Sequence, residues 1–78
     1  MRSIVNVVEE LMDMNSALNE IDDEKLFDEM VYEINNKIEE MWREYSVSEV
    51  SKELEKYEIE RWDFVDYIWK VKEYMVEA

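Results

Sequence analysis

The sequence predicts an all-α protein, a small antiparallel bundle of three helices that forms one domain over residues 1–78. Three observations predict this fold. The chain contains no glycine and no proline, so no residue favours a left-handed turn or an open loop. Apolar residues recur at alternating steps of three and four, which is the period of a packed helix. The hydrophobic content of 47% is too high for a disordered acidic chain.

The first predicted helix covers residues 3–21. Its apolar stripe consists of Ile4, Val7, Leu11, Met14, Leu18 and Ile21. Ser3 is the expected N-cap, because a serine side chain accepts a hydrogen bond from a free amide of the first turn. The stripe stops after Ile21, so we expect a short break at residues 21–23. Asp22 or Asp23 then caps the next helix.

The second predicted helix covers residues 23–45. Its stripe consists of Phe27, Val31, Ile34, Ile38, Met41 and Tyr45. Met30 and Trp42 widen this stripe into a face that can pack against two neighbours.

The third predicted helix covers residues 46–76. Ser46 lies three residues before Glu49, which is the pattern of a capping box at a helix start. The stripe that follows includes Val50, Leu54, Tyr57, Phe64, Ile68, Val71 and Met75, and Arg61 interrupts it. The alternatives are one continuous helix or a bend near residues 58–60. We favour continuity, because the chain holds no helix breaker there.

A second apolar row follows the same helix and consists of Ile59, Trp62, Val65, Trp69 and Val76. A helix that is apolar on most sides is buried on several sides. A three-helix monomer leaves an outer face on each helix, so we expect this aromatic row to be exposed and to mediate association into a homodimer. The other interpretations are that Trp62 and Trp69 lean over the core, or that the row binds a foreign partner.

The charge is strongly acidic, with 22 Asp and Glu against 9 Lys and Arg and a net charge of -13. Nucleic acid and anionic membrane surfaces repel such a chain, so we expect neither as a direct ligand. No stretch approaches the ~20 apolar residues of a membrane span. Glu9 and Glu10 come too early for a signal peptide, and the chain has no cysteine. We therefore expect a cytoplasmic protein.

The residue types leave little room for catalysis. The absence of histidine and cysteine excludes imidazole and thiolate metal sites, and the absence of glycine excludes phosphate loops and EF-hand loops. Glu9, Glu10 and Asp13 form an EExxD motif, which resembles the acidic motif of the all-helical nucleotide pyrophosphohydrolases of the MazG type. That resemblance implies a magnesium site, but a chain with 22 carboxylates produces such spacings on any solvated face. We predict no enzyme activity, no metal and no cofactor.

The carboxylates are concentrated in residues 9–33, where Lys25 is the single basic residue. This acidic ridge consists of Glu9, Glu10, Asp13, Glu20, Asp22, Asp23, Glu24, Asp28, Glu29 and Glu33. Carboxylates one helical turn apart recur every ~5 Å, and DNA carries a phosphate every ~3.4 Å per strand. The ridge can therefore enter a basic groove that is built for nucleic acid.

In size and charge the chain resembles the small acidic proteins with which phages and mobile elements block host nucleases or polymerases. We therefore expect an inhibitor or regulator that mimics DNA and acts in anti-defence on a protein with a basic surface. One alternative is that the carboxylates only keep the bundle soluble. Another is a homo-oligomeric scaffold or adaptor that binds through the aromatic row.

Overall fold

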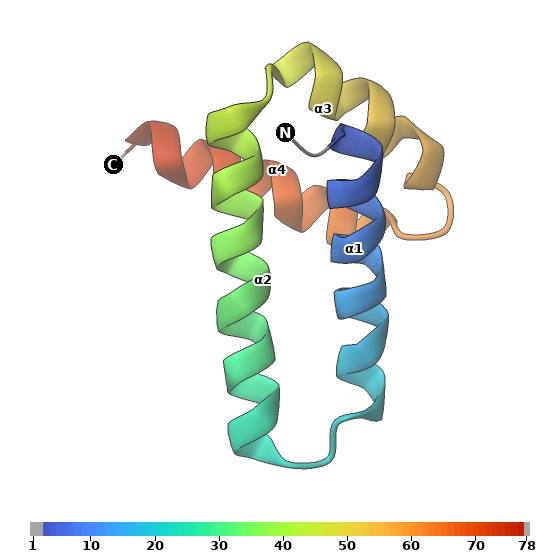
Figure 1. The fold of residues 1–78 in the computed structure, drawn as a ribbon, viewed down its shortest axis with the longest axis vertical. Coiled ribbons are helices and arrows are strands. Elements are labelled where there is room, and N and C mark those ends of the chain that lie inside the picture. The colour runs from blue at the N-terminus through green and yellow to red at the C-terminus, as the bar shows by residue number, and fades with distance from the viewer. Residues whose placement is uncertain (1–2, 78) are drawn as a thin grey trace.

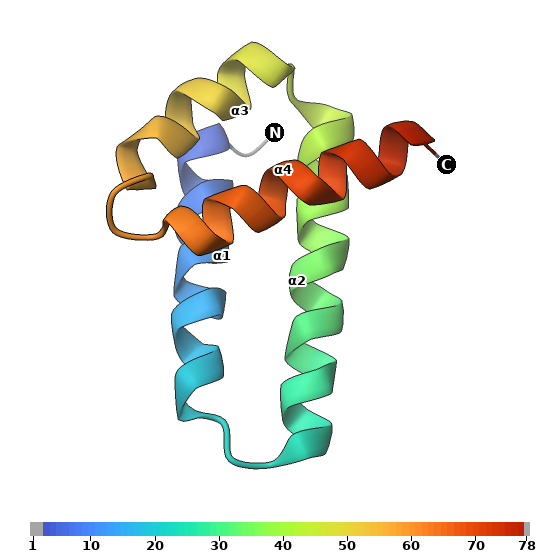
Figure 2. The same ribbon diagram turned by 180° about the vertical axis from the view of Figure 1, so that it is seen from behind.

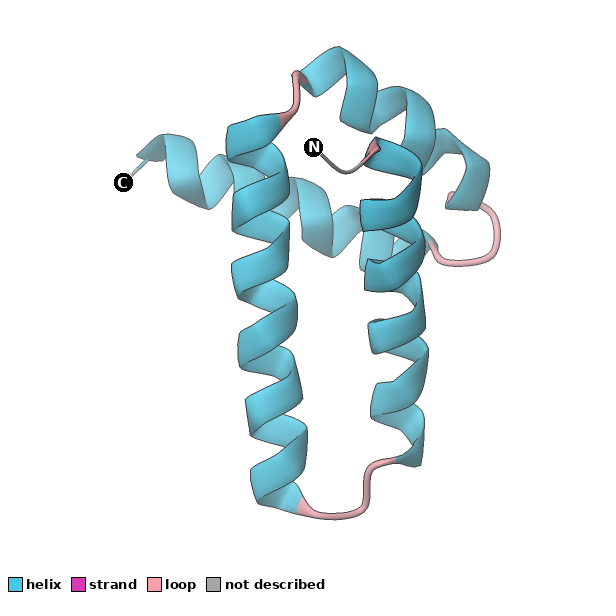
Figure 3. Cartoon of the chain, viewed as in Figure 1, coloured by secondary structure: helices cyan, strands magenta, loops and turns pink. Residues whose placement is uncertain are grey.

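The computed structural model describes the backbone of residues 3–77 and the side chains of residues 3–75. The helices are α1 (Ile4–Ala17), the short 3-10 helix η1 (Leu18–Glu20), α2 (Glu24–Glu44), α3 (Val47–Leu54), the 3-10 helix η2 (Glu55–Tyr57) and α4 (Trp62–Glu77). Figure 3 shows that helices joined by short loops account for this part of the chain, without any strand. The predicted all-α bundle is confirmed.

Helices α1 and α2 form an antiparallel hairpin, which is the longest part of the molecule (Figure 1). The side chain of Ser3 accepts a hydrogen bond from the amide of Asn6, as expected for the N-cap of α1. The chain then breaks at residues 21–23, where the sequence predicted a break. The Asp23 carboxylate caps α2 by accepting hydrogen bonds from the amides of Lys25 (2.9 Å) and Leu26 (3.1 Å).

Helix α3 begins at the predicted capping box. The Ser46 hydroxyl accepts a hydrogen bond from the Glu49 amide, and the Glu49 carboxylate accepts one from the Ser46 amide, both at 3.2 Å. Each of these bonds satisfies an amide that has no partner inside the helix. The short connection from Glu44 to Val47 therefore turns the chain sharply, and α3 lies across one end of the hairpin (Figure 1).

The prediction of one continuous third helix over residues 46–76 is wrong. Helix α3 ends at Leu54, η2 adds one turn, and the chain reverses through residues 58–61 before α4 begins at Trp62. The alternative bend near residues 58–60 has the right location. Residues 3–77 thus hold four α-helices instead of the predicted three, and α4 runs back across the hairpin (Figure 2).

Burial explains why the chain bends without a glycine or a proline. A straight helix over residues 46–76 would be about 46 Å long, whereas α2 is about 31 Å long. Laid along α2, such a helix would extend about a third of its length past the hairpin into solvent. The bend instead buries Val50 and Leu54 of α3 and also Phe64 and Ile68 of α4. Tertiary packing decides helical structure more strongly than local propensity does.

The core lies where α3 and α4 meet the hairpin. It consists of Val7, Val8, Leu11, Met12, Ile34, Ile38, Met41, Trp42, Val50, Leu54, Phe64, Val65 and Ile68. Trp42 of α2 fixes α4 in this core, because its indole Nε1 donates a buried hydrogen bond of 3.0 Å to the Ile68 carbonyl. No residue of this core belongs to residues 20–33, at the opposite end of the hairpin.

Candidate functional site: an acidic hairpin end

The hairpin end, defined here as residues 20–33, projects away from the other helices. It comprises the last residue of η1, the break and the first half of α2. Figures 1 and 2 show from opposite sides that α3 and α4 lie near the other end of the hairpin. The hairpin end holds seven carboxylates and Lys25. All seven carboxylate side chains are exposed.

None of these seven carboxylates forms an ion pair with any residue that the structure describes. Glu10–Lys37, Glu53–Lys56 and Asp66–Lys70 are ion pairs elsewhere in the molecule. The Asp23 carboxylate is engaged as the N-cap of α2, and Glu24 lies in the first turn, where a negative charge is favourable. The carboxylates of Asp28, Glu29 and Glu33 have no comparable structural role.

The acidic ridge predicted over residues 9–33 is therefore divided by the fold. Seven of its ten members lie at the hairpin end. Glu10 is half-buried and pairs with Lys37 of α2 at 2.8 Å. Glu9 and Asp13 are exposed on α1, where their charges act on Tyr57 of η2. They therefore do not belong to the hairpin end.

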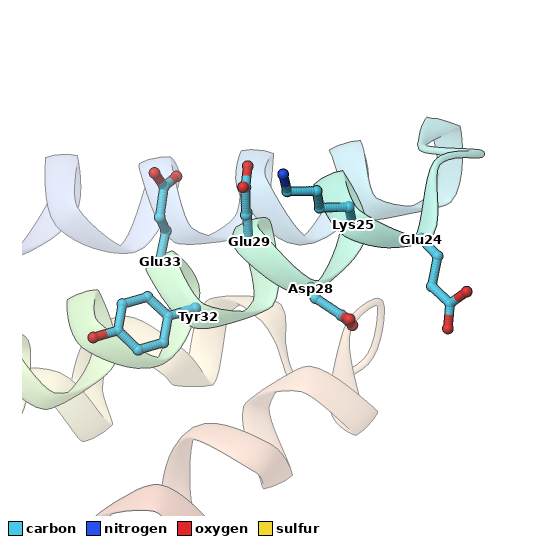
Figure 4. Close-up of a pocket in the computed structure, with 6 residues that line it drawn as sticks. All are labelled: Glu24, Lys25, Asp28, Glu29, Tyr32 and Glu33. Atoms are coloured by element: carbon cyan, nitrogen blue, oxygen red, sulfur yellow. The ribbon is translucent and has the colours of Figure 1, made fainter.

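The outward face of α2 is the densest part of the hairpin end. Its surface depression is lined by Glu24, Lys25, Asp28, Glu29, Tyr32 and Glu33. Figure 4 shows these side chains pointing to both sides of a single helix, so they do not converge on one small ligand. Tyr32 is 68% exposed in the middle of this face. The arrangement suits contact with an extended surface better than chelation.

Tyr57 lies in a second acidic environment, near the carboxylates of Glu9 on α1 and Glu53 on α3. Burial raises the pKa of the Tyr57 hydroxyl above its ordinary value of 10.0, and the carboxylates of Glu9 and Glu53 raise it further. The Glu53 side chain is buried, and both its oxygens accept from the Lys56 ammonium. The Glu53 carboxylate is thus tied into the fold, in contrast to Asp28, Glu29 and Glu33, which form no ion pair with the described residues.

The sequence predicted that the aromatic row is exposed as one surface. This prediction is wrong, because the structure buries part of the row. Ile59 is 95% exposed and Trp62 is 65% exposed, but Val65 is buried. Trp69 packs against the core with its ring centroid 5.0 Å from that of Trp42. The side chain of Val76 lies outside the described residues. The bend divides the row, because α4 presents Val65 and Trp69 to the hairpin, while Ile59 in the turn and Trp62 at the first position of α4 are exposed.

Two clefts line the flanks of α4. The first, which we call the α4 cleft, has a volume of about 350 Å³ and is lined by Asn15, Leu18, Val31, Ile34, Asp63, Phe64 and Tyr67. The second is about 820 Å³ and is lined by Asn35, Glu39, Arg43, Tyr67, Lys70, Val71, Tyr74 and Met75. Tyr67 separates the two and donates a hydrogen bond from its hydroxyl to Asn35 of α2. Sequence reasoning missed both clefts, since they exist only because α4 folds back.

The described residues contain no group of three His, Cys, Asp or Glu side chains that could hold a metal ion. The EExxD motif does not converge, because Glu10 turns toward Lys37. None of the described helices combines the length and the apolar content that a membrane crossing requires. Comparisons with protein-family models, curated protein sequences and solved structures found no match to this chain.

Proposed function

We propose that the protein is a non-enzymatic inhibitor or regulator that binds a nucleic-acid-handling protein. In this proposal the hairpin end occupies the partner's basic surface in place of nucleic acid. The size and charge of the chain are those of phage-type anti-defence proteins, and we place it in that class, acting in the cytoplasm.

One observation carries the proposal. The carboxylates of the hairpin end are exposed, form no ion pair with the side chains of residues 3–75 and lie on a part of the hairpin that contributes no buried residue to the core. Solubility alone requires acidic residues over the whole surface and gives no reason for this concentration. A cluster of like charges on a projecting end costs stability through repulsion, and it generates the field that steers a basic partner.

The proposal can be tested with two variants of equal net charge. The hairpin-end variant carries Glu20→Gln, Asp28→Asn, Glu29→Gln and Glu33→Gln. The matched variant carries Glu40→Gln, Glu58→Gln, Glu60→Gln and Glu73→Gln, which neutralise exposed carboxylates elsewhere. Neither set touches a cap or an ion pair that the structure shows.

Each immobilised protein is exposed to a set of purified DNA- and RNA-binding proteins at about 50 mM and about 500 mM salt. We expect the wild type and the matched variant to retain a binder at low salt and to release it when duplex DNA is added. The hairpin-end variant should retain far less. A binder that resists added DNA, or that binds both variants equally, would contradict mimicry.

The exposed turn favours a second candidate function, a homo-oligomeric scaffold or adaptor. Ile59 in the turn and Trp62 at the start of α4 are both exposed, and exposed tryptophans are frequent interface hot spots. The homodimer expected from the sequence would then form through this turn. Sedimentation of Trp62→Ala beside the wild type tests it: a wild-type dimer that becomes a monomer supports the scaffold, and two monomers contradict it.

A further inference from the structure

We infer that the α4 cleft receives an apolar anchor side chain from the basic partner, flanked in that partner by lysine or arginine. The inference rests on the proposed function, because it names a second feature of the same partner. It adds an apolar contact to a surface that would otherwise bind through charge alone.

The α4 cleft lies where α4 crosses the hairpin, on the side nearer the hairpin end. Leu18 comes from η1, Val31 from α2 and Phe64 from α4. Leu18 and Val31 are only partly buried, so the cleft exposes apolar surface. Phe27 lies one helical turn before Val31 on the same face of α2 and is 39% exposed, which extends this surface toward the hairpin end.

The aromatic side chains at the roof of the cleft are held by two contacts. The rings of Phe64 and Tyr67 stack with their centroids 6.4 Å apart, and the Tyr67 hydroxyl is held by Asn35. Phe64 is itself buried against the core. Because these side chains already have partners in the free protein, a ligand that enters the cleft would immobilise them at a smaller cost in conformational entropy.

The charges around the cleft indicate the chemistry of the occupant. Asp63 lines it directly, and Asp28 lies one helical turn before Val31 on α2. An apolar contact surrounded by carboxylates is complementary to an apolar side chain surrounded by cations. A second copy of this chain is a poor occupant, because it brings a further net charge of -13 to the same acidic surface.

The size of the cleft indicates how much of the partner enters it. Its volume of about 350 Å³ is at the lower limit of small-ligand pockets. One leucine, methionine or phenylalanine side chain fits this description, and a whole helix does not. Buried apolar anchors at the centre of a polar rim are the usual arrangement of binding hot spots.

Two synthetic helical peptides of equal length and equal charge test the inference. One carries a single leucine flanked by lysines, and in the other that leucine is replaced by serine. Binding of both peptides is measured by calorimetry at about 50 mM and about 500 mM salt. We expect the leucine peptide to bind about tenfold or more tightly than the serine peptide and to keep that advantage at high salt.

The decisive variants are Val31→Glu and Tyr32→Glu, which add the same charge at neighbouring positions of α2. Val31 lines the α4 cleft, whereas Tyr32 is exposed on the outward face. If the surface acts through charge alone, both variants should bind the leucine peptide at least as tightly as the wild type does. An apolar anchor site loses the leucine advantage in Val31→Glu and keeps it in Tyr32→Glu. Phe27→Glu serves as a second cleft variant if Val31→Glu unfolds.

Three outcomes would overturn the inference. The first is equal binding of the two peptides to the wild type, and the second is an unchanged leucine advantage in both cleft variants. The third is a wild-type dimer in sedimentation that Val31→Glu dissociates, since a second copy would then occupy the cleft. The proposed function is tested separately, because its failure appears as a nucleic-acid-binding protein that resists added DNA or binds the hairpin-end and matched variants equally.

Discussion

Replacing Trp42 by phenylalanine should loosen α4 from the hairpin. Trp42 is buried in α2 and makes three contacts with α4. Its indole donates to the Ile68 carbonyl at 3.0 Å, its ring packs against Trp69, and the Lys72 ammonium lies 4.9 Å above it. Phenylalanine preserves an aromatic ring, but it has no donor and a smaller surface.

The expected loss of stability follows from these contacts. A buried hydrogen bond contributes about 1 kcal/mol net, and an aromatic pair contributes about 0.5–1.5 kcal/mol beyond its burial. Phenylalanine keeps part of the second contribution but leaves a void where the larger ring was. We therefore expect Trp42→Phe to lower the free energy of unfolding by about 2–3 kcal/mol, which corresponds to about 10–20 °C in melting temperature for a domain of this size.

Trp62→Phe is the matched control, because the same replacement is made at a ring that is 65% exposed. Urea unfolding followed by far-ultraviolet circular dichroism measures both variants. The control should stay within about 0.5 kcal/mol of the wild type, as surface replacements do. If Trp42→Phe also stays within that margin, the indole hydrogen bond and the packing of Trp69 do not hold α4 in place, and the reasoning is wrong.

Three further predictions concern the caps and the charges. Ser46→Ala removes one half of the capping box and should cost about 1 kcal/mol in urea unfolding, whereas Ser48→Ala on the same helix should cost little. Because the pKa of Tyr57 is raised in the fold, its contribution to stability is complete below about pH 10 and is lost as the pH rises through the higher folded pKa. Unfolding free energies above pH 10 should therefore fall more steeply for the wild type than for Tyr57→Phe, and parallel curves would contradict this. The hairpin-end variant should melt at a higher temperature than the matched variant at low salt, because carboxylates one turn apart repel each other, and the difference should shrink in high salt.

The local features of the fold were predictable because they depend on neighbouring residues. The caps at Ser3, Asp23 and Ser46 all form as the sequence indicated. In each case a short polar side chain precedes an apolar stripe, and the hydrogen bond it makes spans two or three residues. The position of the break at residues 21–23 follows in the same way from the end of the first stripe.

The bend and the clefts were not predictable, because they depend on how distant helices share the hairpin. Arg61 was the one local signal, and it was compatible with either a snorkelling side chain or a bend. Val8 and Met12 lie beside the predicted stripe of the first helix, and Val65 belongs to the row that was predicted to be exposed, yet all three are buried. Apolar residues that recur at steps of three and four predict one packed face of a helix. Helix α1 packs against both α2 and α3, so it buries a second face that this pattern does not predict.

The fold separates the residues that stabilise it from the residues that we expect to bind. The buried side chains lie where α3 and α4 cover the hairpin, and the hairpin end contributes none of them. Charges can accumulate at that end because none of these carboxylates is part of the buried core. The α4 cleft lies at the boundary between the two regions, where Phe64 is core and Val31 is surface. A partner that used both regions would combine an attraction that salt weakens with an apolar contact that salt leaves intact. Partner binding by Val31→Glu should therefore depend on salt more steeply than binding by the wild type. Partner binding by the hairpin-end variant should depend on salt less steeply than binding by the wild type.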